Sequence, residues 1–389
     1  MHYSCPRTDP AGQSDYTVAQ VIERFHESFF VRYGDSLSFE QRKALQAILE
    51  CRTEYMGGHK CYCTQCQQYH FFYHSCNHRN CPICGAQDTA TWVEQRLEQA
   101  LPLPLPLPHY MITFTLPAQL RPICMNVPEK IYPLFFRCAA QAIKDILANP
   151  THLGIEAGFF GVLQTWQQNL TLHPHIHFIV PAGGLAPGGN LIIAKKQWLV
   201  WGDVFAKRLK NLLLTELKQQ AIAEQTIIDA CWKIDWNVDV ENFGNGYNAI
   251  KYLGRYIYKS AIHGSRIEGI DDTHVTFTVK DRQTKKIKRI RITGEDFLMR
   301  YFTHVLPSKF HRIRYYGFMH PRAKATFAII QARLNAAPKK QIVDKPEPAS
   351  TPFKCPKCGN PMDIIEHRPR APPQLRTITW IWQPAQKVA

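Results

Sequence analysis

Two closely spaced cysteine pairs constrain the fold of this 389-residue chain more than any other feature of its sequence. Cys63 and Cys66 form one Cys-x-x-Cys turn, and Cys81 and Cys84 form another after a gap of 14 residues. Each short turn directs two thiolates toward one point, and the aromatic segment 69–73 is typical of a hairpin that would bring the turns together. This spacing predicts a zinc ribbon in which the four cysteines hold one structural Zn²⁺.

More potential metal ligands lie nearby than one zinc ion needs. Five of them leave open a second metal site or a different ligand set: Cys51, His59, Cys61, Cys76 and His78. Near the C-terminus, Cys355 and Cys358 form half a site, which either pairs with another half elsewhere in the fold or binds no metal. No apolar segment resembles a signal peptide, so we expect a cytoplasmic protein whose thiols stay reduced and hold metal.

The charge of the chain indicates a polyanionic partner. Its 47 lysines and arginines exceed its 31 acidic residues, which gives a formal net charge of +16. Basic side chains that neutralise phosphates release condensed counterions, so nucleic acid is the first candidate and an anionic membrane surface the second. No run approaches the roughly 18 consecutive apolar residues of a membrane-spanning helix, and we therefore expect no membrane partner.

The periodicity of apolar residues predicts an α+β domain after Pro108. The expected strands are 110–116, 159–165, 171–180 and 231–238, and the expected helices are 128–147, 198–223 and 247–262. The order β-α-β-β-α-β plus a final helix is that of a ferredoxin-like arrangement, an antiparallel sheet with helices on one face.

Changes in composition divide the chain into seven segments. Two N-terminal helices come first, and the second is expected to begin at Ser38, with Gln41 at the spacing of a capping box. The Leu-Pro repeat predicts a semi-rigid spacer. The expected segments are the N-terminal helices at 1–50, a zinc-binding domain at 51–100, the proline linker at 101–108, the α+β core with its last helix at 109–265, a basic hairpin and C-terminal extension at 266–335, a linker at 336–352 and a tail around the last cysteine pair at 353–389.

A histidine-rich strand indicates a catalytic site. Alternate side chains of a strand share a face, so His175 and His177 point together while the apolar residues between and after them point to the other side. Two neighbouring imidazoles can chelate one cation. The alternative is a solvent-facing strand with polar alternation, and the apolar residues around this His-x-His pattern favour the metal site.

The last expected helix of the α+β core carries Tyr252 and Tyr256, which are four residues apart and therefore share one face. Aromatic residues at this spacing commonly pack in a core, but these two are flanked by cations: Lys251, Arg255 and Lys259. A phenol can attack phosphorus when a metal polarises the phosphoryl group and cations stabilise the developing charge. Attack on a DNA phosphodiester would leave a covalent phosphotyrosine and a free hydroxyl, and the strand could later be rejoined without a nucleotide cofactor.

These features together resemble the HUH superfamily of single-strand DNA nucleases, and more narrowly the rolling-circle insertion-sequence transposases with an N-terminal zinc-binding domain and one or two catalytic tyrosines. The resemblance covers most of the chain and is carried by the blocks CRTEYMGGHKCYCTQC with SCNHRNCPICG, NLTLHPHIHFIVPAGG, YLGRYIYKSAI and HVLPSKFHRIRYYGF. It implies an HUH nuclease core with Tyr252 and Tyr256 as nucleophiles. A second nucleophile would hold one strand while another is cut, and where only one acts, Tyr256 is expected.

The resemblance also implies that His175 and His177 bind a catalytic cation. Gln164 on the preceding strand is the expected third ligand, at a position where many relatives are expected to carry histidine, and Gln168 and His173 are its competitors. Imidazole combined with oxygen donors suits Mg²⁺ or Mn²⁺.

Basic residues expected to contact DNA lie beside the tyrosines, in a hairpin of strands 275–279 and 287–292, and in the block HRIRYYG: Arg255, Lys259, Lys286, Lys288, Arg289, Arg312 and Arg314. Cations interleaved with aromatic rings can hold single-stranded DNA through backbone neutralisation and base stacking. The alternatives are a solvated sheet edge for the hairpin and a packed strand with internally paired arginines for HRIRYYG.

The sequence therefore predicts a bacterial-type, nucleoid-associated transposase that cuts and rejoins single-stranded DNA at insertion-sequence ends and at target DNA. It would act through a 5'-phosphotyrosine intermediate, with structural Zn²⁺ and catalytic Mg²⁺ or Mn²⁺. A plasmid rolling-circle replication initiator or relaxase is the alternative with the same chemistry, and the zinc cluster argues against it. A non-catalytic zinc-containing DNA-binding regulator is the alternative from another class.

Overall fold

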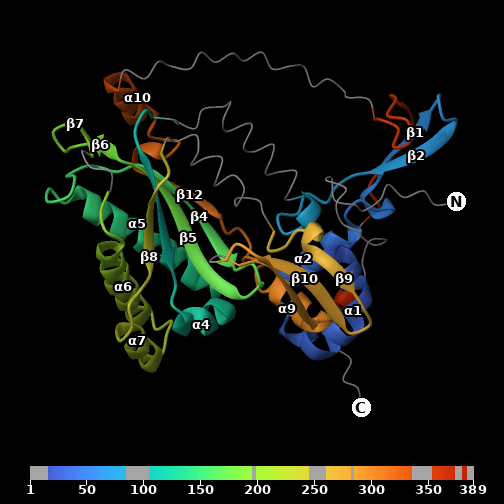
Figure 1. Ribbon diagram of the computed structural model, residues 1–389, viewed down its shortest axis with the longest axis horizontal. Helices are drawn as coiled ribbons and strands as arrows, with labels where there is room; N and C mark the ends of the chain where they lie inside the picture. The colour runs from blue at the N-terminus through green and yellow to red at the C-terminus, as the bar shows by residue number, and fades with distance from the viewer. Residues whose placement is uncertain are drawn as a thin grey trace.

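The computed structural model describes residues 16–84, 105–194, 199–244, 260–281, 284–334, 353–372 and 379–382. These residues form two lobes and a small cysteine-rich sheet (Figure 1). The expected tyrosine helix lies outside the described residues except for its last three positions, and the expected linker at 336–352 lies wholly outside them.

A five-stranded antiparallel sheet is the centre of the first lobe, which we call the sheet lobe. Its strands are β3 (His109–Thr115), β4 (Phe159–Trp166), β5 (Leu172–Pro181), β8 (Val238–Asn242) and β12 (Ile313–Tyr316), in the spatial order β12-β4-β5-β3-β8. The first four strands and the helices between them follow the chain order β-α-β-β-α-β, and β12 is added at one edge. The predicted α+β fold with an antiparallel ferredoxin-like sheet is confirmed.

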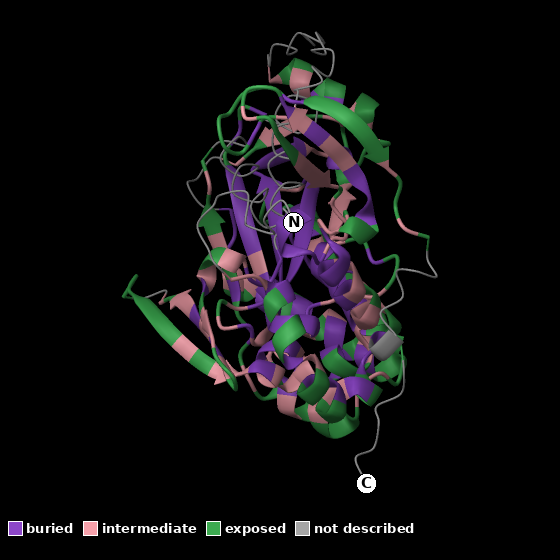
Figure 2. Ribbon diagram, turned by 90° about the vertical axis from the view of Figure 1, so that its right-hand side faces the viewer, coloured by how far each residue is buried: buried purple, intermediate pink, exposed green. Residues whose placement is uncertain are grey.

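Helices cover one face of this sheet (Figure 1). They are α4 (Arg121–Asn126), α5 (Pro128–Ala148), α6 (Gly202–Gln219) and α7 (Gln225–Trp232). Ile176, Phe178 and Val180 of β5 share one core with Phe136 of α5 and Phe205 of α6, as strand alternation requires. Figure 2 shows that the buried residues are concentrated in the strands of the sheet and on the inner sides of the helices.

The expected strand at 231–238 is wrong over most of its length. Residues up to Trp232 belong to α7, and only Val238 lies in a strand, at the start of β8. Ile228 and Cys231 are both buried and are three residues apart, which is a helical spacing. The indole N–H of Trp236 donates to the carbonyl oxygen of Cys231 at 3.1 Å, so an irregular turn separates α7 from β8.

The other face of the sheet is partly covered by η5 (Gly317–Met319) and α10 (Lys324–Arg333). Phe318 and Phe327 pack there against apolar residues of β4 and β5. Leu105 and Leu107 join this cluster, so the described half of the segment 101–108 packs against the sheet lobe. The prediction of a semi-rigid spacer did not include this packing, in which both leucine side chains bury apolar surface.

Segments from both halves of the chain build the second lobe, which we call the helical lobe. It contains α1 (Val18–Tyr33), α2 (Phe39–Glu50), β9 (Ile267–Ile270), β10 (His274–Lys280), β11 (Ile287–Thr293) and α9 (Gly294–Phe302). The predicted capping box between Ser38 and Gln41 is present at the start of α2, and the predicted hairpin corresponds to β10 and β11. Phe25 and Phe29 of α1 share one core with Phe277, Phe297 and Phe302, so the segments expected separately at 1–50 and 266–335 form one unit here.

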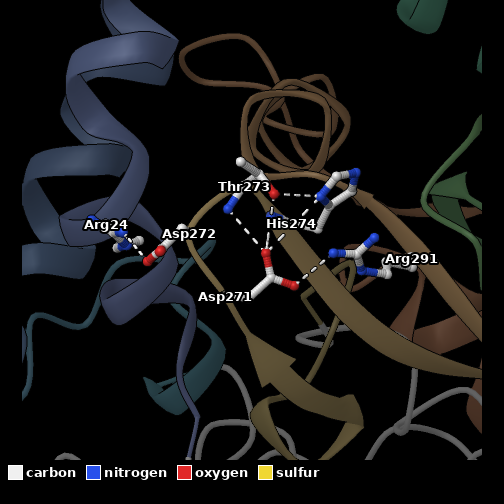
Figure 3. A network of polar contacts seen from close by, with 6 residues as sticks. All are labelled: Arg24, Asp271, Asp272, Thr273, His274 and Arg291. Atoms are coloured by element: carbon white, nitrogen blue, oxygen red, sulfur yellow. Dashed lines mark hydrogen bonds and ion pairs between the residues drawn. The ribbon is translucent and has the colours of Figure 1, made fainter.

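The turn between β9 and β10 connects the hairpin to the first helix through polar contacts (Figure 3). Arg24 of α1 pairs with Asp272, while Arg291 of β11 donates to Asp271 at 3.0 Å. The backbone N–H groups of Thr273 and His274 also donate to the Asp271 carboxylate. The Thr273 N–H, the Arg291 guanidinium and the His274 N–H hold the pKa of Asp271 below its ordinary value.

The cysteine-rich sheet is made from β1 (Gly58–Cys63), β2 (Gln68–Tyr73) and β13 (Asp363–Arg368), in the order β13-β1-β2. The remaining short elements are η1 (Gly34–Ser36), η2 (Glu54–Met56), η3 (Ala118–Leu120), η4 (Gly264–Arg266), β6 (Gly183–Leu185), β7 (Leu191–Ile193) and α12 (Thr379–Trp382). Across the described ranges, every helix is too short or too polar to cross a membrane.

Candidate functional site

The face of the sheet opposite α5 and α6 carries the predicted catalytic metal ligands. His175 and His177 of β5 are buried, and the centroids of their rings are 4.8 Å apart. Gln164 of β4 is also buried and lies directly opposite His175 in the strand register. Directly opposed residues of neighbouring strands share a face, so the fold brings these three side chains together.

Hydrogen bonds orient both imidazoles. Nδ1 of His175 is 2.7 Å from the carbonyl oxygen of His173, which can only accept, so this nitrogen carries the proton and Nε2 carries the lone pair. Nδ1 of His177 is 2.9 Å from Oγ1 of Thr113 on β3. Metal-binding histidines commonly donate their second ring N–H to such a partner, which fixes the tautomer and the ring orientation.

The side-chain oxygen of Gln164 fits a cation. Its Nε2 donates to the carbonyl oxygen of Trp166 at 3.1 Å, whereas its Oε1 is buried and has no hydrogen-bond partner in the described part of the chain. A buried polar atom without a partner is destabilising by about 1 to 3 kcal/mol. A cation held by Oε1 and the two imidazoles would satisfy this oxygen, and such a mixed donor set suits Mg²⁺ or Mn²⁺.

The two competing third ligands differ in their surroundings. Oε1 of Gln168 accepts a hydrogen bond from the backbone N–H of Lys280 at 2.5 Å, so it is already engaged away from the histidines. His173 lies on the same face, with its ring centroid 5.3 Å from that of His175. Gln164 is therefore better placed than Gln168 to supply an oxygen donor, and His173 stays an alternative ligand.

Two carboxylates lie on the same face and were missed by the sequence analysis. Asp239 of β8 is opposite Thr113 of β3, which in turn is opposite His177, so one row crosses three strands. Glu241 follows two residues later on the same face, and burial and a hydrogen bond to Asp239 raise the pKa of its carboxyl group. The sequence analysis did not place these two carboxylates on the sheet because the expected strand ended at residue 238, before both of them.

The predicted nucleophiles, Tyr252 and Tyr256, and the cations Arg255 and Lys259 lie outside the described residues. The chain that follows them is anchored, because Ala261 and Ile262 are buried in the core of the helical lobe.

A first group of four cysteines lies at the base of the β1–β2 hairpin. The sulfur atoms of Cys51, Cys76, Cys81 and Cys84 are all within 4.8 Å of one another, and the sulfur of Cys84 is 3.6 Å from that of Cys51 and 3.5 Å from that of Cys76. Hydrogen bonds from the other three thiols, first from Cys51, hold the pKa of Cys84 far below its ordinary value. Four neighbouring thiols cannot all ionise without a cation, and Zn²⁺ is the ion that four thiolates prefer.

A second group contains Cys63, Cys66, Cys355 and Cys358, whose sulfur atoms also lie within 4.8 Å of one another. The expectation that the pairs Cys63–Cys66 and Cys81–Cys84 share one site is therefore wrong. The first pair lies at the tip of the hairpin and the second at its base. Each strand of the hairpin has six residues, which at about 3.4 Å per residue separates tip from base by roughly 20 Å.

Three histidines form a further cluster across the cysteine-rich sheet. The side chains of His59, His74 and His367 have ring nitrogens within 4.8 Å of one another. Only His59 had been considered as a ligand from the sequence. His367 could not be linked to it, because β13 reaches β1 from the far end of the chain. His74 follows β2 directly and comes beside His59 through the pairing of β1 with β2.

The first cysteine group is joined to both lobes. Arg79, which lies between Cys76 and Cys81, donates to the carbonyl oxygens of Leu306, Pro307 and Phe310, next to the core of the sheet lobe. Cys51 ends α2, and Cys81 and Cys84 are part of the core of the helical lobe. A metal ion here would stabilise the junction between the lobes.

The predicted DNA contacts differ in their surroundings. Lys286, Lys288 and Arg289 are exposed on the β10–β11 hairpin, and two of them pair with carboxylates, Lys288 with Asp281 and Arg289 with Glu268. Contacts of that kind fit either a solvated edge or a surface that binds phosphates.

Arg312 and Arg314 both lie beside aromatic rings of the protein. The guanidinium carbon of Arg312 is 5.6 Å from the ring centroid of Trp166, and burial lowers the pKa of Arg312 to about 10. Arg314 is 4.7 Å from the ring centroid of Phe136, yet it also lines an open cleft of about 430 Å³ beside α5. Three further cations line this cleft: Lys130, Arg137 and Lys144. Only Arg314 of the two therefore reaches a surface where phosphates could bind.

The chain is similar to transposases over most of its length. Residues 158–326 match a family described as "Putative transposase", and residues 21–116 match one described as "Transposase zinc-binding domain". The "Putative transposase y4qJ" of Sinorhizobium fredii is 34% identical over 325 residues, which cover 78% of this chain and 80% of the relative. The "Transposase for insertion sequence element IS801" of Pseudomonas savastanoi pv. phaseolicola is 28% identical over 336 residues, which cover 80% of each chain. No solved structure matches significantly.

Proposed function

The chain belongs to the IS91-type rolling-circle transposases that carry a zinc-binding domain, and we propose that it cuts and rejoins single-stranded DNA at insertion-sequence ends through a 5'-phosphotyrosine intermediate. As a transposase, it acts on DNA. The observation that carries the proposed chemistry is the set of two oriented imidazoles, from His175 and His177, and the buried oxygen of Gln164, which has no hydrogen-bond partner among the described residues.

The protein's own groups would position and cleave the strand. A bound Mg²⁺ or Mn²⁺ would polarise the scissile phosphate and stabilise its charge. The phenol oxygen of Tyr256 would attack phosphorus and lose its proton to water, while the bond from phosphorus to the 3' oxygen breaks and that oxygen takes up a proton. The products are a 5'-phosphotyrosine and a free 3' hydroxyl. A 3' hydroxyl can later attack the phosphotyrosine and restore the tyrosine, and Tyr252 would serve a second strand.

Basic surfaces support binding of the DNA backbone. The formal net charge is +16, and the cleft beside α5 gathers Arg314, Lys130, Arg137 and Lys144 next to the ring of Tyr316. Arg255 and Lys259 would flank the attacked phosphate, while Lys286, Lys288 and Arg289 complete the set proposed to hold the strand. Neutralising phosphates in this way makes binding strongly dependent on salt. The expected contact of Arg312 with DNA is not part of this proposal, because this residue is buried beside Trp166.

Formation of a covalent protein–DNA adduct tests the proposal. The protein is mixed with labelled single-stranded oligonucleotides of the insertion-sequence ends and Mn²⁺, and the products are separated on a denaturing gel. We expect an adduct that Tyr256→Phe loses and that the matched control Tyr258→Phe keeps. His175→Ala with His177→Ala should abolish the adduct yet leave DNA binding nearly unchanged.

Two results would contradict the proposal. If the folded parent protein binds the oligonucleotide but forms no adduct, it is a non-catalytic DNA-binding protein. If the adduct persists in Tyr256→Phe, Tyr252→Phe and their combination, the assignment of the nucleophiles is wrong.

A further inference from the structure

The C-terminal segment 353–368 lies outside both matched families, which end at residues 116 and 326, yet it packs on the zinc-binding domain. We propose that this segment closes a second structural zinc site, with Cys63 and Cys66 of the hairpin tip and Cys355 and Cys358 of the tail as its four ligands. The bound zinc locks the tail onto the hairpin and makes β13 the third strand of the domain.

The distances between the sulfur atoms match a tetrahedral zinc site. Zinc–sulfur bonds of about 2.3 Å place the sulfurs of a regular tetrahedron about 3.8 Å apart. The sulfur of Cys63 is 3.6 Å from that of Cys358, and the sulfur of Cys355 is 3.9 Å from that of Cys66. These distances are far longer than the length of a disulfide bond, about 2.05 Å, and the spacing of the four sulfurs suits a central ion.

Both turns have the backbone of a metal-binding knuckle. The N–H of Cys66 donates to the sulfur of Cys63 at 3.4 Å, which directs that sulfur inward. In the tail, the N–H of Gly359 donates to the carbonyl oxygen of Cys355 at 2.8 Å, and Gly359 has a φ of +74° that favours glycine. The N–H of Cys355 donates in turn to the carbonyl oxygen of Asn360 at 2.8 Å. Each pair is thus held by a tight local turn before any metal binds.

The two faces of the cysteine-rich sheet carry different side chains, and only one face contacts the tail. On β1 and β2, Cys63, His70 and Phe72 point to the tail, and Phe72 packs on Phe353 with ring centroids 4.6 Å apart. The opposite face carries Lys60 over the rings of Tyr69 and Phe71. This alternation places the cysteines on the side that receives the tail.

The apolar contacts at this site are too few to hold the tail alone. The buried residues of this cluster are Cys61, Cys63, Cys355 and Met362, and three of these four are cysteines. Small units with so little apolar core usually require a metal or a disulfide to be stable. The zinc ion would therefore supply the stability that apolar packing does not provide here. It would join Cys66 and Cys355, which are 289 positions apart in the chain.

Zinc stoichiometry and tail retention test the proposal in the full-length protein. Zinc is counted by elemental mass spectrometry in the parent, in Cys355→Ser with Cys358→Ser, and in the adjacent control Lys357→Ser. We expect the double variant to hold one zinc fewer than the parent and the control to hold the same number. An unchanged zinc count in the double variant would overturn the proposal.

A second measurement needs no cysteine variant. A protease site is placed in the expected linker at 336–352, the purified protein is cut there, and the pieces are passed over a size-exclusion column. A second cut within 373–378 removes α12, whose Ile381 is buried in the core of the helical lobe. The segment 353–372 should then stay with the body until a chelator removes zinc. Release of the tail while all zinc is still bound, or release by a reductant and not by a chelator, would refute a zinc clamp. Neither experiment depends on DNA cleavage, so failure of the proposed function would leave this result unaffected.

Discussion

Replacing Thr113 by valine should lower the affinity of the proposed catalytic site for its cation, although Thr113 is not itself a metal ligand. The Thr113 hydroxyl lies 2.9 Å from Nδ1 of His177, and the histidine is buried, so water cannot readily replace this partner. If Nε2 of His177 binds the ion, Nδ1 carries the hydrogen and donates a hydrogen bond to the hydroxyl oxygen of Thr113. Valine has the shape of threonine but cannot accept, so the ring loses its preferred tautomer and orientation.

The size of the effect follows from the role of such outer partners. Removing one typically weakens metal affinity or activity by about 10- to 100-fold, which corresponds to about 1.4 to 2.8 kcal/mol. We therefore expect Thr113→Val to shift the Mn²⁺ concentration for half-maximal adduct formation upward by that factor. Adduct formation at saturating Mn²⁺ should largely recover, because the nucleophile and the ligands are intact.

Thr115→Val is the matched control. Thr115 lies two residues along the same strand, on the same face and opposite His175, whose Nδ1 is bound by a backbone carbonyl instead. The reasoning is refuted if Thr113→Val titrates with Mn²⁺ like the parent, or if Thr115→Val shows an equal shift.

Three further predictions concern buried groups. His304 is fully buried between Thr165 and Leu170, and burial lowers its pKa from 6.5 to about 4. Above pH 6.5 this histidine is neutral in both the folded and the unfolded chain. Below pH 6.5 the unfolded chain binds a proton that the folded chain does not, so the unfolding free energy should fall by about 3 kcal/mol between pH 6.5 and 4. Urea titrations of the parent that give the same unfolding free energy across this range would exclude this prediction. Gly161→Ala places a Cβ 2.4 Å from the ring of Phe178 and should lower the unfolding free energy by about 1 to 3 kcal/mol, measured as a lower urea midpoint. Gln164→Leu should abolish Mn²⁺-dependent adducts but keep the unfolding free energy of the metal-free protein within about 1 kcal/mol of the parent. The substitution removes one hydrogen bond together with one buried oxygen that has no partner among the described residues. A large loss of unfolding free energy would instead mean that Gln164 has a structural role.

Local patterns predicted the elements of the sheet lobe well. The strands β3, β4 and β5 and the helix α5 lie within a residue or two of the expected ranges, because alternation and helical periodicity are properties of neighbouring residues. The face shared by His175 and His177 follows from the same alternation. The segment between α6 and β8 was misread, since its short apolar run fits a strand or a helix equally well and only packing decides.

The grouping of distant segments could not be read from local patterns. The helices at the N-terminus complete their core with β10 and α9, and Leu105 and Leu107 of the Leu-Pro repeat pack on the sheet. In both cases apolar surface is buried against residues far away in the chain, and nothing in the spacing of neighbouring residues records which partner will cover it.

The amino-acid sequence by itself determined the class of the molecule: the ligand types, the order β-α-β-β-α-β, the paired histidines and the blocks shared with a transposase family. Only the tertiary structure decided which cysteines meet. A spacing of two residues forces each Cys-x-x-Cys pair together, but the strand β2 lies between Cys66 and Cys76 and separates the two pairs by its own length. Each pair therefore completes its set of ligands with residues from elsewhere in the chain. The tail cysteines find their partners for the same reason, because β13 pairs with β1 across almost the whole chain.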